Sequence, residues 1–395
     1  MIRISNKVFY LGTNDRKKFL FENNWPLPNG VAYNSYIIAD EHTALIDTLE
    51  YGSNPDYLSD IDACLGGRPL EYLIVNHMEP DHSSMIGEVL RRYPQVRIVA
   101  NSKTFKILES YYPVPSENIL QVGDGSRLEL GHHSLLFVLT PWVHWPETMM
   151  TYDTADRILF SCDAFGSFGT LDGGVFDDEV NFSFYEDEMR RYYSNIVGKW
   201  SGMVRKAFKK LEGVPVDIIC PSHGIIWRTD PGKVLSLYDK WSRYESEKGV
   251  VIAFASMYGN TEKFADSIAR ALAVRGIKDI RVHDASRTHA SFILSDIWKY
   301  KGLILGSCAY NTGMHPMMQL LVHEISVSAP SGKVLGIFGG SSWNASGSKA
   351  LMEFAAGAGM PVVGNAPIEF LGRPYPEDIG KIEAFADKFA EELGK

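Results

Sequence analysis

Histidine and carboxylate residues follow the ends of four apolar, strand-like segments in the N-terminal part of the chain. The segments are residues 72–75, 135–139, 158–160 and 216–220. The residues that follow them are His77, Glu79, Asp81 and His82 after the first segment, and then His144, Asp163 and His223. Functional side chains of α/β proteins gather at such strand ends. The pattern therefore predicts one site assembled from four segments that are distant in sequence.

The residue types at this predicted site indicate a pair of metal ions. Four imidazoles and three carboxylates are available, and a carboxylate can bridge two ions. We expect Asp163 to be the bridge. Three carboxylates and one bridging hydroxide would balance the charge of two divalent ions, which lowers the cost of burying them. Such a mixed nitrogen and oxygen ligand set suits iron or manganese better than a structural zinc ion.

Each of these residues also has an ordinary structural interpretation. A single buried histidine is usually a hydrogen-bonded core residue, and a single Asp before a turn is usually a cap. In the 77–82 segment, Asp81 or Ser83 could start a helix over residues 85–90. Four ligand-type residues within six positions, together with three matching strand ends, favour the metal site.

A second chemical feature begins at residue 250, where an apolar strand, a small polar loop and a helix are expected in succession. The loop consists of Ser256, Met257, Tyr258, Gly259, Asn260 and Thr261. Backbone N–H groups at the start of a helix, with nearby hydroxyl and amide groups, can hold a phosphate. No Lys follows Gly259, which disfavours a loop for nucleoside triphosphates. The simpler alternative is a plain strand-to-helix turn.

Two further loops follow buried parallel strands expected at 302–306 and 333–338. The first loop contains Ser307, Ala309, Tyr310 and Asn311, and the second contains Gly340, Ser341, Ser342 and Trp343. An aromatic ring such as Tyr310 or Trp343 could stack on a flat ligand. For Trp343, packing at the surface or in an interface is an equally ordinary interpretation.

The metal-binding pattern resembles that of a known family. Zinc hydrolases of the metallo-β-lactamase fold carry His-x-His-x-Asp-His, and this chain has Glu79 in place of the second His. With that substitution the segment resembles the flavodiiron proteins. The resemblance implies one iron on His77, Glu79 and His144, a second iron on Asp81, His82 and His223, and Asp163 between them.

The C-terminal part resembles flavodoxins, which bind the phosphate of FMN without a positive charge. The resemblance implies that the loop at 256–261 holds the phosphate and that the other two loops hold the isoalloxazine ring. One departure is Ser307-Cys308-Ala309, where flavodoxins often have Ser-Pro-Thr.

Length and pattern predict two domains. The 395 residues exceed the usual limit of about 250–300 residues for one hydrophobic core. We expect an α/β protein: residues 1–248 as a metallo-β-lactamase-like αββα sandwich and residues 249–395 as a flavodoxin-like, doubly wound parallel sheet.

Net charge, apolar runs and cysteine spacing argue against nucleic acid binding, a membrane span and a cysteine-based site. The net charge of −9 argues against nucleic acid binding. No apolar run approaches the roughly 18 residues of a membrane span, and no secretory signal is visible. The cysteines at 64, 162, 220 and 308 lack Cys-x-x-Cys spacing, which argues against a disulfide framework or a rubredoxin-type site. We expect a cytoplasmic protein with no membrane partner.

The resemblance implies an oxidoreductase that reduces O2 to water, NO to N2O, or both, at a non-haem diiron site supplied by FMN. It also implies a separate electron donor, such as rubredoxin or a reduced deazaflavin, and a head-to-tail homodimer or a dimer of dimers. Two alternatives stay open at this point. One is a binuclear metal hydrolase fused to a flavodoxin-like electron-transfer domain, which Glu79 disfavours, and the other is a pure electron carrier.

Overall fold

The computed structural model describes residues 2–395, and packing divides the chain into two compact units. The first unit ends at Ser242 and the second runs from Arg243 to Lys395. The predicted domain boundary after residue 248 lies inside the first strand of the second unit, β17 (Glu247–Ala255). No helix among residues 2–395 is long and apolar enough to cross a membrane.

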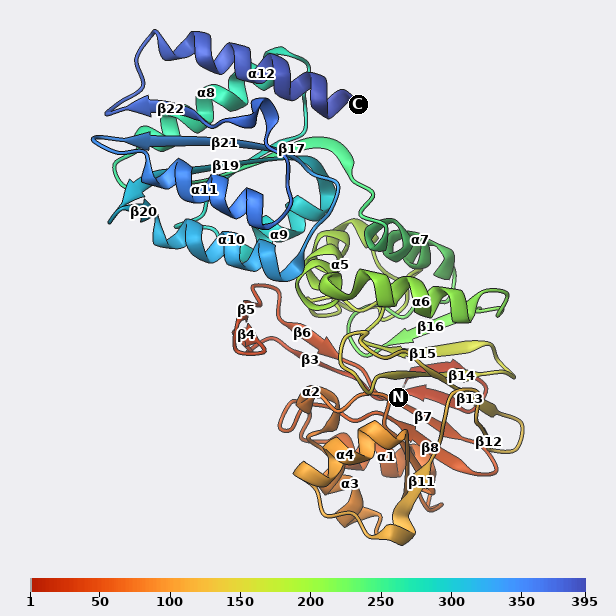
Figure 1. Ribbon diagram of the computed structural model, residues 1–395. Helices are drawn as coiled ribbons and strands as arrows, with labels where there is room; N and C mark the ends of the chain where they lie inside the picture. Colours follow the sequence, from red (N-terminus) through yellow and green to blue (C-terminus); the bar gives the residue numbers. More distant parts are fainter. Residues whose placement is uncertain (1) are drawn as a thin grey trace. The chain divides into compact units, whose positions relative to one another are not determined.

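The first unit is built on two large sheets (Figure 1). In spatial order, the seven-stranded sheet consists of β1 (Ile2–Ser5), β2 (Val8–Tyr10), β7 (Tyr36–Ala39), β8 (Thr43–Ile46), β9 (Tyr72–Ile74), β10 (Arg97–Ala100) and β11 (Ile119–Gln121). The five-stranded sheet consists of β12 (Arg127–Glu129), β13 (Ser134–Leu139), β14 (Met149–Asp153), β15 (Ile158–Cys162) and β16 (Ile218–Pro221). Strands β8 to β11 pair in parallel, as do β15 and β16.

Helices and short strand pairs complete the first unit. Its α-helices are α1 (Tyr57–Leu65), α2 (Pro80–Ser83), α3 (Ile86–Arg92), α4 (Ser102–Tyr111), α5 (Glu186–Tyr192), α6 (Ser201–Leu211) and α7 (Pro231–Ser242). Figure 1 shows α1, α3 and α4 beside the first sheet and α6 and α7 beside the second. The short strands are β3 (Thr13–Asp15) with β6 (Val31–Tyr33), and β4 (Leu20–Phe21) with β5 (Trp25–Pro26). Together these layers form the predicted αββα sandwich.

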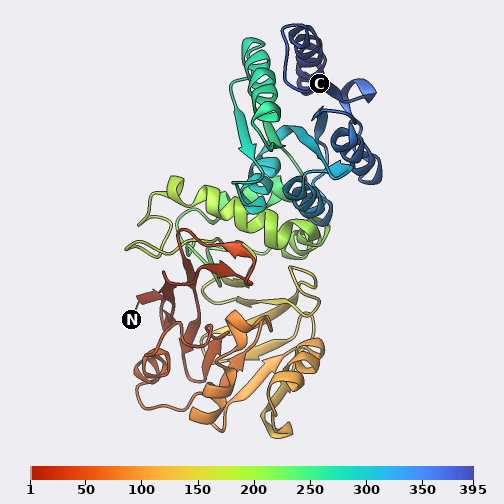
Figure 2. The same cartoon turned by 90° about the vertical axis from the view of Figure 1, so that its left-hand side faces the viewer.

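The second unit is a parallel sheet with helices on both faces, which can be followed in Figures 1 and 2. Its spatial order is β18 (Ile280–Asp284), β17, β19 (Tyr300–Tyr310), β21 (Val334–Ser341) and β22 (Ile368–Leu371), and β20 (Gly313–Met314) pairs with the end of β19. This is the strand order of flavodoxin-like folds. The central strands are continuously apolar because both of their faces are covered.

Two hydrophobic cores lie on the two faces of this sheet. One core is formed with α9 (Ala290–Lys299), α10 (Pro316–Ser328) and α11 (Ser346–Gly357). The other is formed with α8 (Asn260–Val274) and α12 (Asp378–Gly394). The predicted fold class is confirmed in both units.

The alternative helix start at Asp81 or Ser83 is wrong. The short helix α2 begins at Pro80, because proline fits the first turn of a helix, where its missing N–H is not needed. Helix α3 then starts after Met85, without a cap from the Asp81 or Ser83 side chain. Asp81 and His82 therefore lie within a helical turn, where their side chains are buried.

Candidate metal centre and flavin pocket

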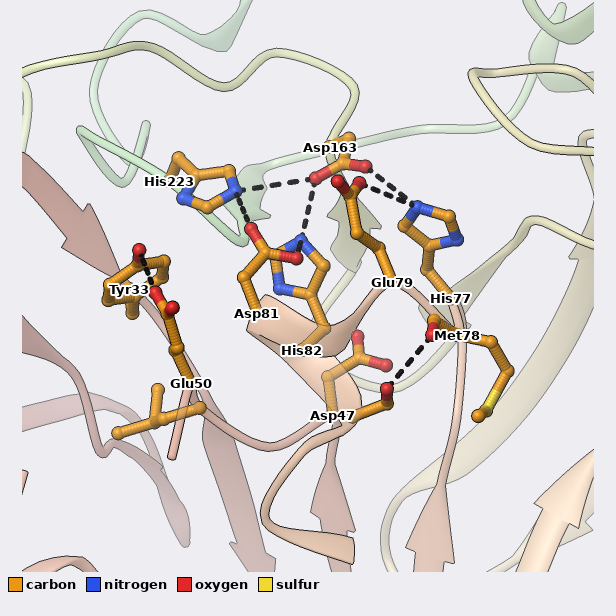
Figure 3. A network of polar contacts seen from close by, with 12 residues as sticks. Tyr33, Asp47, Glu50, His77, Met78, Glu79, Asp81, His82, Asp163 and His223 are labelled. Atoms are coloured by element: carbon orange, nitrogen blue, oxygen red, sulfur yellow. Dashed lines mark hydrogen bonds and ion pairs between the residues drawn. The ribbon is translucent and has the colours of Figure 1, made fainter. Parts of the chain in front are cut away.

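All seven predicted metal ligands are buried, and they meet where the two sheets of the first unit present their strand ends. Figure 3 shows six of them, all except His144. His77 and Glu79 follow β9, while Asp81 and His82 belong to α2. The other three lie after β13, β15 and β16 at His144, Asp163 and His223. Parallel strands end on the same side of a sheet, which explains why segments distant in sequence converge here.

The carboxylate of Asp163 divides the four imidazoles into two pairs. Its Oδ2 lies 3.3 Å from Nε2 of His77 and 3.3 Å from Nε2 of His144. Its Oδ1 lies 2.9 Å from Nε2 of His82 and 3.5 Å from Nε2 of His223. One oxygen therefore faces each pair, which is the arrangement that a bridging carboxylate needs.

Each pair of imidazoles has a second carboxylate. Oε2 of Glu79 is 3.3 Å from Nε2 of His77 and 3.0 Å from Nε2 of His144. The Asp81 oxygens lie 3.3 Å from Nε2 of His82 and 3.2 Å from Nε2 of His223. In each group the candidate ligand atoms lie within 4.8 Å of one another. The seven side chains thus form two adjoining groups of metal-ligand geometry.

Hydrogen bonds donated by the outer ring nitrogens orient two imidazoles so that their Nε2 atoms face the centre. Nδ1 of His77 lies 2.7 Å from Oε1 of Glu147, and Nδ1 of His223 lies 2.9 Å from the carbonyl oxygen of Ala32. Outer partners of this kind fix the tautomer and the ring orientation of metal-binding histidines. In both rings Nε2 is left for a ligand in the centre.

The polar atoms at this centre fit a bound metal pair. Within residues 2–395, both Asp81 oxygens, Oδ2 of Asp163 and Nε2 of His223 are buried without a well-aligned hydrogen bond. Each such atom costs about 1–3 kcal/mol when it is left unpaired. Metal ions would satisfy all of them at once, and mixed carboxylate and imidazole donors suit non-haem iron.

The ionisation of these groups is tightly linked. Burial lowers the pKa of His144, but hydrogen bonds with Asp163 and Glu79 outweigh burial and raise that pKa to about 9. Burial also opposes charge on His223, yet Asp163 and Asp81 raise its pKa to about 10. Burial would raise the pKa of Asp163, but the charge of His82 and the surrounding imidazoles hold this pKa well below its usual range. Metal binding must therefore displace protons from the imidazoles.

Two carboxylates at the site were not predicted from the sequence. Glu147 follows His144 by three positions, a spacing that could have suggested it. Glu22 lies in the turn between β4 and β5, and its carboxyl accepts a hydrogen bond from Nε1 of Trp25 at 2.9 Å and contacts Glu79. Although Glu22 as a whole residue is exposed, desolvation of its carboxyl group, and then the charge of Glu79, raise the pKa of Glu22 to about 7. No local pattern marks Glu22, because its partner comes from a distant part of the chain.

In the second unit, the three predicted flavin loops line one pocket together with one residue of β22 and one residue just after it. The pocket lining consists of Ser256, Met257, Tyr258, Asn260, Thr261, Cys308, Ala309, Gly340, Ser341, Ser342, Trp343, Phe370 and Gly372. Cys308, Phe370 and Gly372 were not predicted as flavin contacts. Tyr310 and Asn311 lie at and beyond the end of β19, outside this lining. Ser307 is buried, where its hydroxyl donates to the carbonyl of Cys308 and accepts from the backbone N–H of His315.

The pocket offers what a flavin monophosphate requires. Gly259 precedes α8 with a φ of 84°, a conformation that favours glycine, and its N–H donates to Oγ of Ser256 at 3.0 Å. No side chain among residues 2–395 caps the start of α8, so its N–H groups can take a phosphate. Trp343 is 85% exposed and Tyr258 is 90% exposed, which leaves aromatic faces available to a planar ring. The residues present therefore fit FMN.

Comparisons with known proteins agree with this architecture. Residues 31–224 match the family described as ODP family beta lactamase, and residues 252–369 match flavodoxin. The anaerobic nitric oxide reductase flavorubredoxin of Aliivibrio fischeri is 32% identical over 353 residues, which covers 87% of this chain and 70% of that protein.

Solved structures extend the similarity over both units. Rubredoxin:oxygen oxidoreductase from the anaerobe Desulfovibrio gigas has a TM-score of 0.95 at 27% identity, covering 99% of this chain and 98% of that one. The flavodiiron protein from Giardia intestinalis has a TM-score of 0.93 at 25% identity, with the same coverage of each chain.

The fold and the two sites define a two-domain flavoprotein with a dinuclear metal centre. The chain belongs to the flavodiiron protein family. It is an oxidoreductase, and the cofactors of this architecture are FMN and a non-haem diiron pair. The family resemblance inferred from the sequence is thereby confirmed.

Proposed function

We propose that this protein reduces O2 to water, NO to N2O, or both, at a diiron site in the first unit that receives electrons from FMN in the second. The observation that supports the proposal best is the position of the Asp163 carboxylate, which has one oxygen facing each group of ligands. The substrates follow from two relatives, one named as a nitric oxide reductase and the other as an oxygen oxidoreductase.

The proposed ligands are shared evenly between the two irons. His77, Glu79 and His144 would bind one ion, Asp81, His82 and His223 would bind the other, and Asp163 would lie between them as the shared ligand. The geometry that supports this assignment is the clustering of the ligand atoms of each group within 4.8 Å. Burial of these side chains keeps bulk water from the ions, which strengthens the interaction of the carboxylates with them.

The electron inventory fits both gases. When bound, two ferrous ions and a reduced flavin supply the four electrons that reduction of O2 to two water molecules takes, and coupling of two NO molecules takes two. In the protein, the imidazoles and carboxylates hold the ions side by side. The loops after β17, β19 and β21 orient the flavin.

The electrons come from a separate donor in this proposal. Rubredoxin is one candidate, supported by the name of the Desulfovibrio gigas relative, and a reduced deazaflavin is another. Stopped-flow mixing of the oxidised protein with each reduced donor distinguishes them, because only a competent donor bleaches the flavin absorbance at a rate that supports turnover.

A homodimer arranged head to tail, or a dimer of such dimers, is the proposed assembly. In it the flavin of one subunit serves the irons of the other. Activity per chain is then expected to fall on dilution, in step with dissociation measured by analytical ultracentrifugation. A strictly monomeric form that reduces O2 at the full rate would contradict this assembly.

The proposed location is the cytoplasm. All four cysteines are free in the structure, as expected for a reducing compartment. Fractionation of cells, with the protein detected by antibody, tests this proposal.

The first experiment is to quantify iron, zinc and flavin in one purified sample and then to mix the reduced protein rapidly with O2 or NO. About two irons and one FMN per chain, with gas consumption lost in Asp163→Ala, is the expected result. Two zinc ions that iron cannot replace would instead favour a hydrolase. Full electron transfer to external acceptors in Asp163→Ala, with no gas consumption by either the unaltered protein or the variant, would favour a pure electron carrier.

A further inference from the structure

Glu147 is a buried carboxylate outside the set of seven proposed ligands. It lies in the loop between β13 and β14 and is 2% exposed. Its Oε1 lies 2.7 Å from Nδ1 of His77 and accepts a hydrogen bond from the backbone N–H of Met78 at 3.1 Å. Its Oε2 is buried without a hydrogen-bond partner in the described part of the chain. The contact with His77 joins residues 70 positions apart in sequence.

We propose that Glu147 is a positioning residue that makes the two irons inequivalent, by fixing His77 and increasing the electron donation of its imidazole to one ion. The inference rests on the proposed diiron function and adds a specific role for this side chain. The affected iron is the one assigned to His77, Glu79 and His144. Among residues 2–395, neither His82 nor His223 is hydrogen-bonded through its outer ring nitrogen to a carboxylate; the buried carboxylate of Asp47, near His82, is instead hydrogen-bonded to Asn76.

The asymmetry is visible in the partners of the outer ring nitrogens. His77 has a carboxylate behind it, whereas His223 donates to the neutral carbonyl of Ala32 at 2.9 Å. Nδ1 of His82 is buried with no partner among residues 2–395. Hydrogen bonds to a charged group are roughly twice as strong as neutral ones. Of these three imidazoles, only that of His77 has a charged hydrogen-bond partner at its outer ring nitrogen.

The position of Glu147 is itself fixed from two sides. Its carboxylate is tied to the backbone of Met78, between two proposed ligands, and its carbonyl oxygen accepts a hydrogen bond from Nδ2 of Asn101 at 2.6 Å. Asn101 also caps α4, since its side chain accepts from the N–H groups of Lys103 and Thr104. The loop that carries His144 is thereby held against the loop that carries His77.

This arrangement has two consequences for the iron beside His77. A more basic imidazole binds the ion more tightly, and the loss of such a partner typically weakens metal affinity by roughly 10–100-fold. Greater electron donation also stabilises the ferric state relative to the ferrous state. We therefore expect the iron beside His77 to have the lower reduction potential of the two.

The test compares Glu147→Gln with Glu179→Gln in the complete protein loaded with iron and FMN. Glutamine at 147 keeps an oxygen for His77 and Met78 but removes the charge. Glu179 is a control for the loss of a carboxylate that accepts backbone N–H bonds, from Val175 at 3.1 Å and Phe176 at 3.4 Å; it lies in a different loop, is exposed and pairs with Arg228 at 3.3 Å. The readouts are iron retained against increasing chelator and the potential of each iron in a Mössbauer-monitored redox titration.

In Glu147→Gln we expect one iron to be lost at a roughly 10–100-fold lower chelator concentration and to show a raised reduction potential. The second iron should be retained as in the unaltered protein, and Glu179→Gln should change neither. Equal weakening of both irons, or no change in either, would overturn the role of Glu147. An unaltered protein that binds no iron would instead overturn the proposed function.

Glu147→Asp keeps the test decisive if Glu147→Gln does not fold. The shorter side chain retains the charge but moves it away from His77, so the same single iron should bind more weakly. Its potential should shift in the same direction as in Glu147→Gln. Unchanged affinity and potential in this variant, or weakening of both irons, would equally reject the inference.

Discussion

Nε2 of His82 lies 2.9 Å from Oδ1 of Asp163, on the opposite side of that carboxylate from His77 and His144. The helical turn that starts at Pro80 brings His82 to this position. The ring therefore faces the centre from the same direction as His223, whose ring centroid is 4.8 Å away. This geometry supports the proposal that His82 binds the second iron.

Replacement of His82 by Asn tests that ligand directly. We expect His82→Asn to lose one of two irons at least tenfold more readily than the unaltered protein, because the shorter amide cannot reach the ion. FMN content should stay the same. Iron retained during dialysis against a chelator is the measurement. His133→Asn is the control, since His133 is also buried but contacts Asp153 at 2.8 Å and the carbonyl of Asn6 at 3.0 Å. The iron content of His133→Asn should equal that of the unaltered protein.

Gly30 immediately precedes β6, the strand that contains Ala32. The carbonyl oxygen of Ala32 accepts the hydrogen bond from Nδ1 of His223. Gly30 has a φ of 65°, and a Cβ there would lie 2.5 Å from the carbonyl oxygen of Asp15. We expect Gly30→Ala to lower the free energy of unfolding by about 2–4 kcal/mol, from left-handed strain and overpacking, and to reduce iron content.

Gly52→Ala is the matched control for Gly30. Gly52 has a φ of 82°, with no atom within 4 Å of the position of an added Cβ. We expect Gly52→Ala to lower the free energy of unfolding by only about 1–2 kcal/mol. Equal losses in the two variants, measured by chemical denaturation, would show that packing at Gly30 contributes nothing.

Asn260 opens helix α8 at the flavin pocket. Asn260→Asp places a negative charge where the FMN phosphate is proposed to bind, with little change of shape. We expect the dissociation constant for FMN to rise about tenfold or more, as measured by quenching of flavin fluorescence. Asn365→Asp, an exposed position in the same unit outside the pocket lining, should leave FMN binding unchanged. A similar rise of the dissociation constant for FMN in both variants would show that the added negative charge, and not its position at 260, weakens binding.

Lys333 gives the second unit a pH-dependent stability. Burial lowers the pKa of Lys333 from 10.5 to about 7 in the folded protein, where its Nζ donates to Oγ of Ser246 at 2.7 Å and the carbonyl of Tyr300 at 2.9 Å. Between these two pH values unfolding takes up a proton. The free energy of unfolding should therefore rise with pH from about 7 towards 10.5, by at most about 1.4 kcal/mol per pH unit.

Lys333→Met should remove this rise, as measured by urea unfolding at several pH values with FMN fluorescence as the probe of the second unit. Lys388→Met removes an exposed lysine from the same unit and should retain the rise. An identical pH profile in the unaltered protein and Lys333→Met would refute the assignment to Lys333.

The sequence by itself determined the fold class, the family and the kinds of chemistry. Apolar periodicity marks strands such as β17 and β19, and the polar residues that follow them are adjacent in the chain, so both signals are local. The Glu at position 79 in the 77–82 segment, and the loop that ends at Thr261, therefore predicted two cofactor sites without any knowledge of packing.

Only the tertiary structure decided how those residues are arranged around each centre. It divided the oxygens of Asp163 between two pairs of imidazoles, brought Glu22 against Glu79 and placed Glu147 behind His77. It also gave Ser307 a buried role in holding the backbone. These relationships join residues from different sheets and loops, and the contact between His77 and Glu147 spans 70 positions. Such contacts depend on the three-dimensional packing of whole elements, which local residue patterns do not encode.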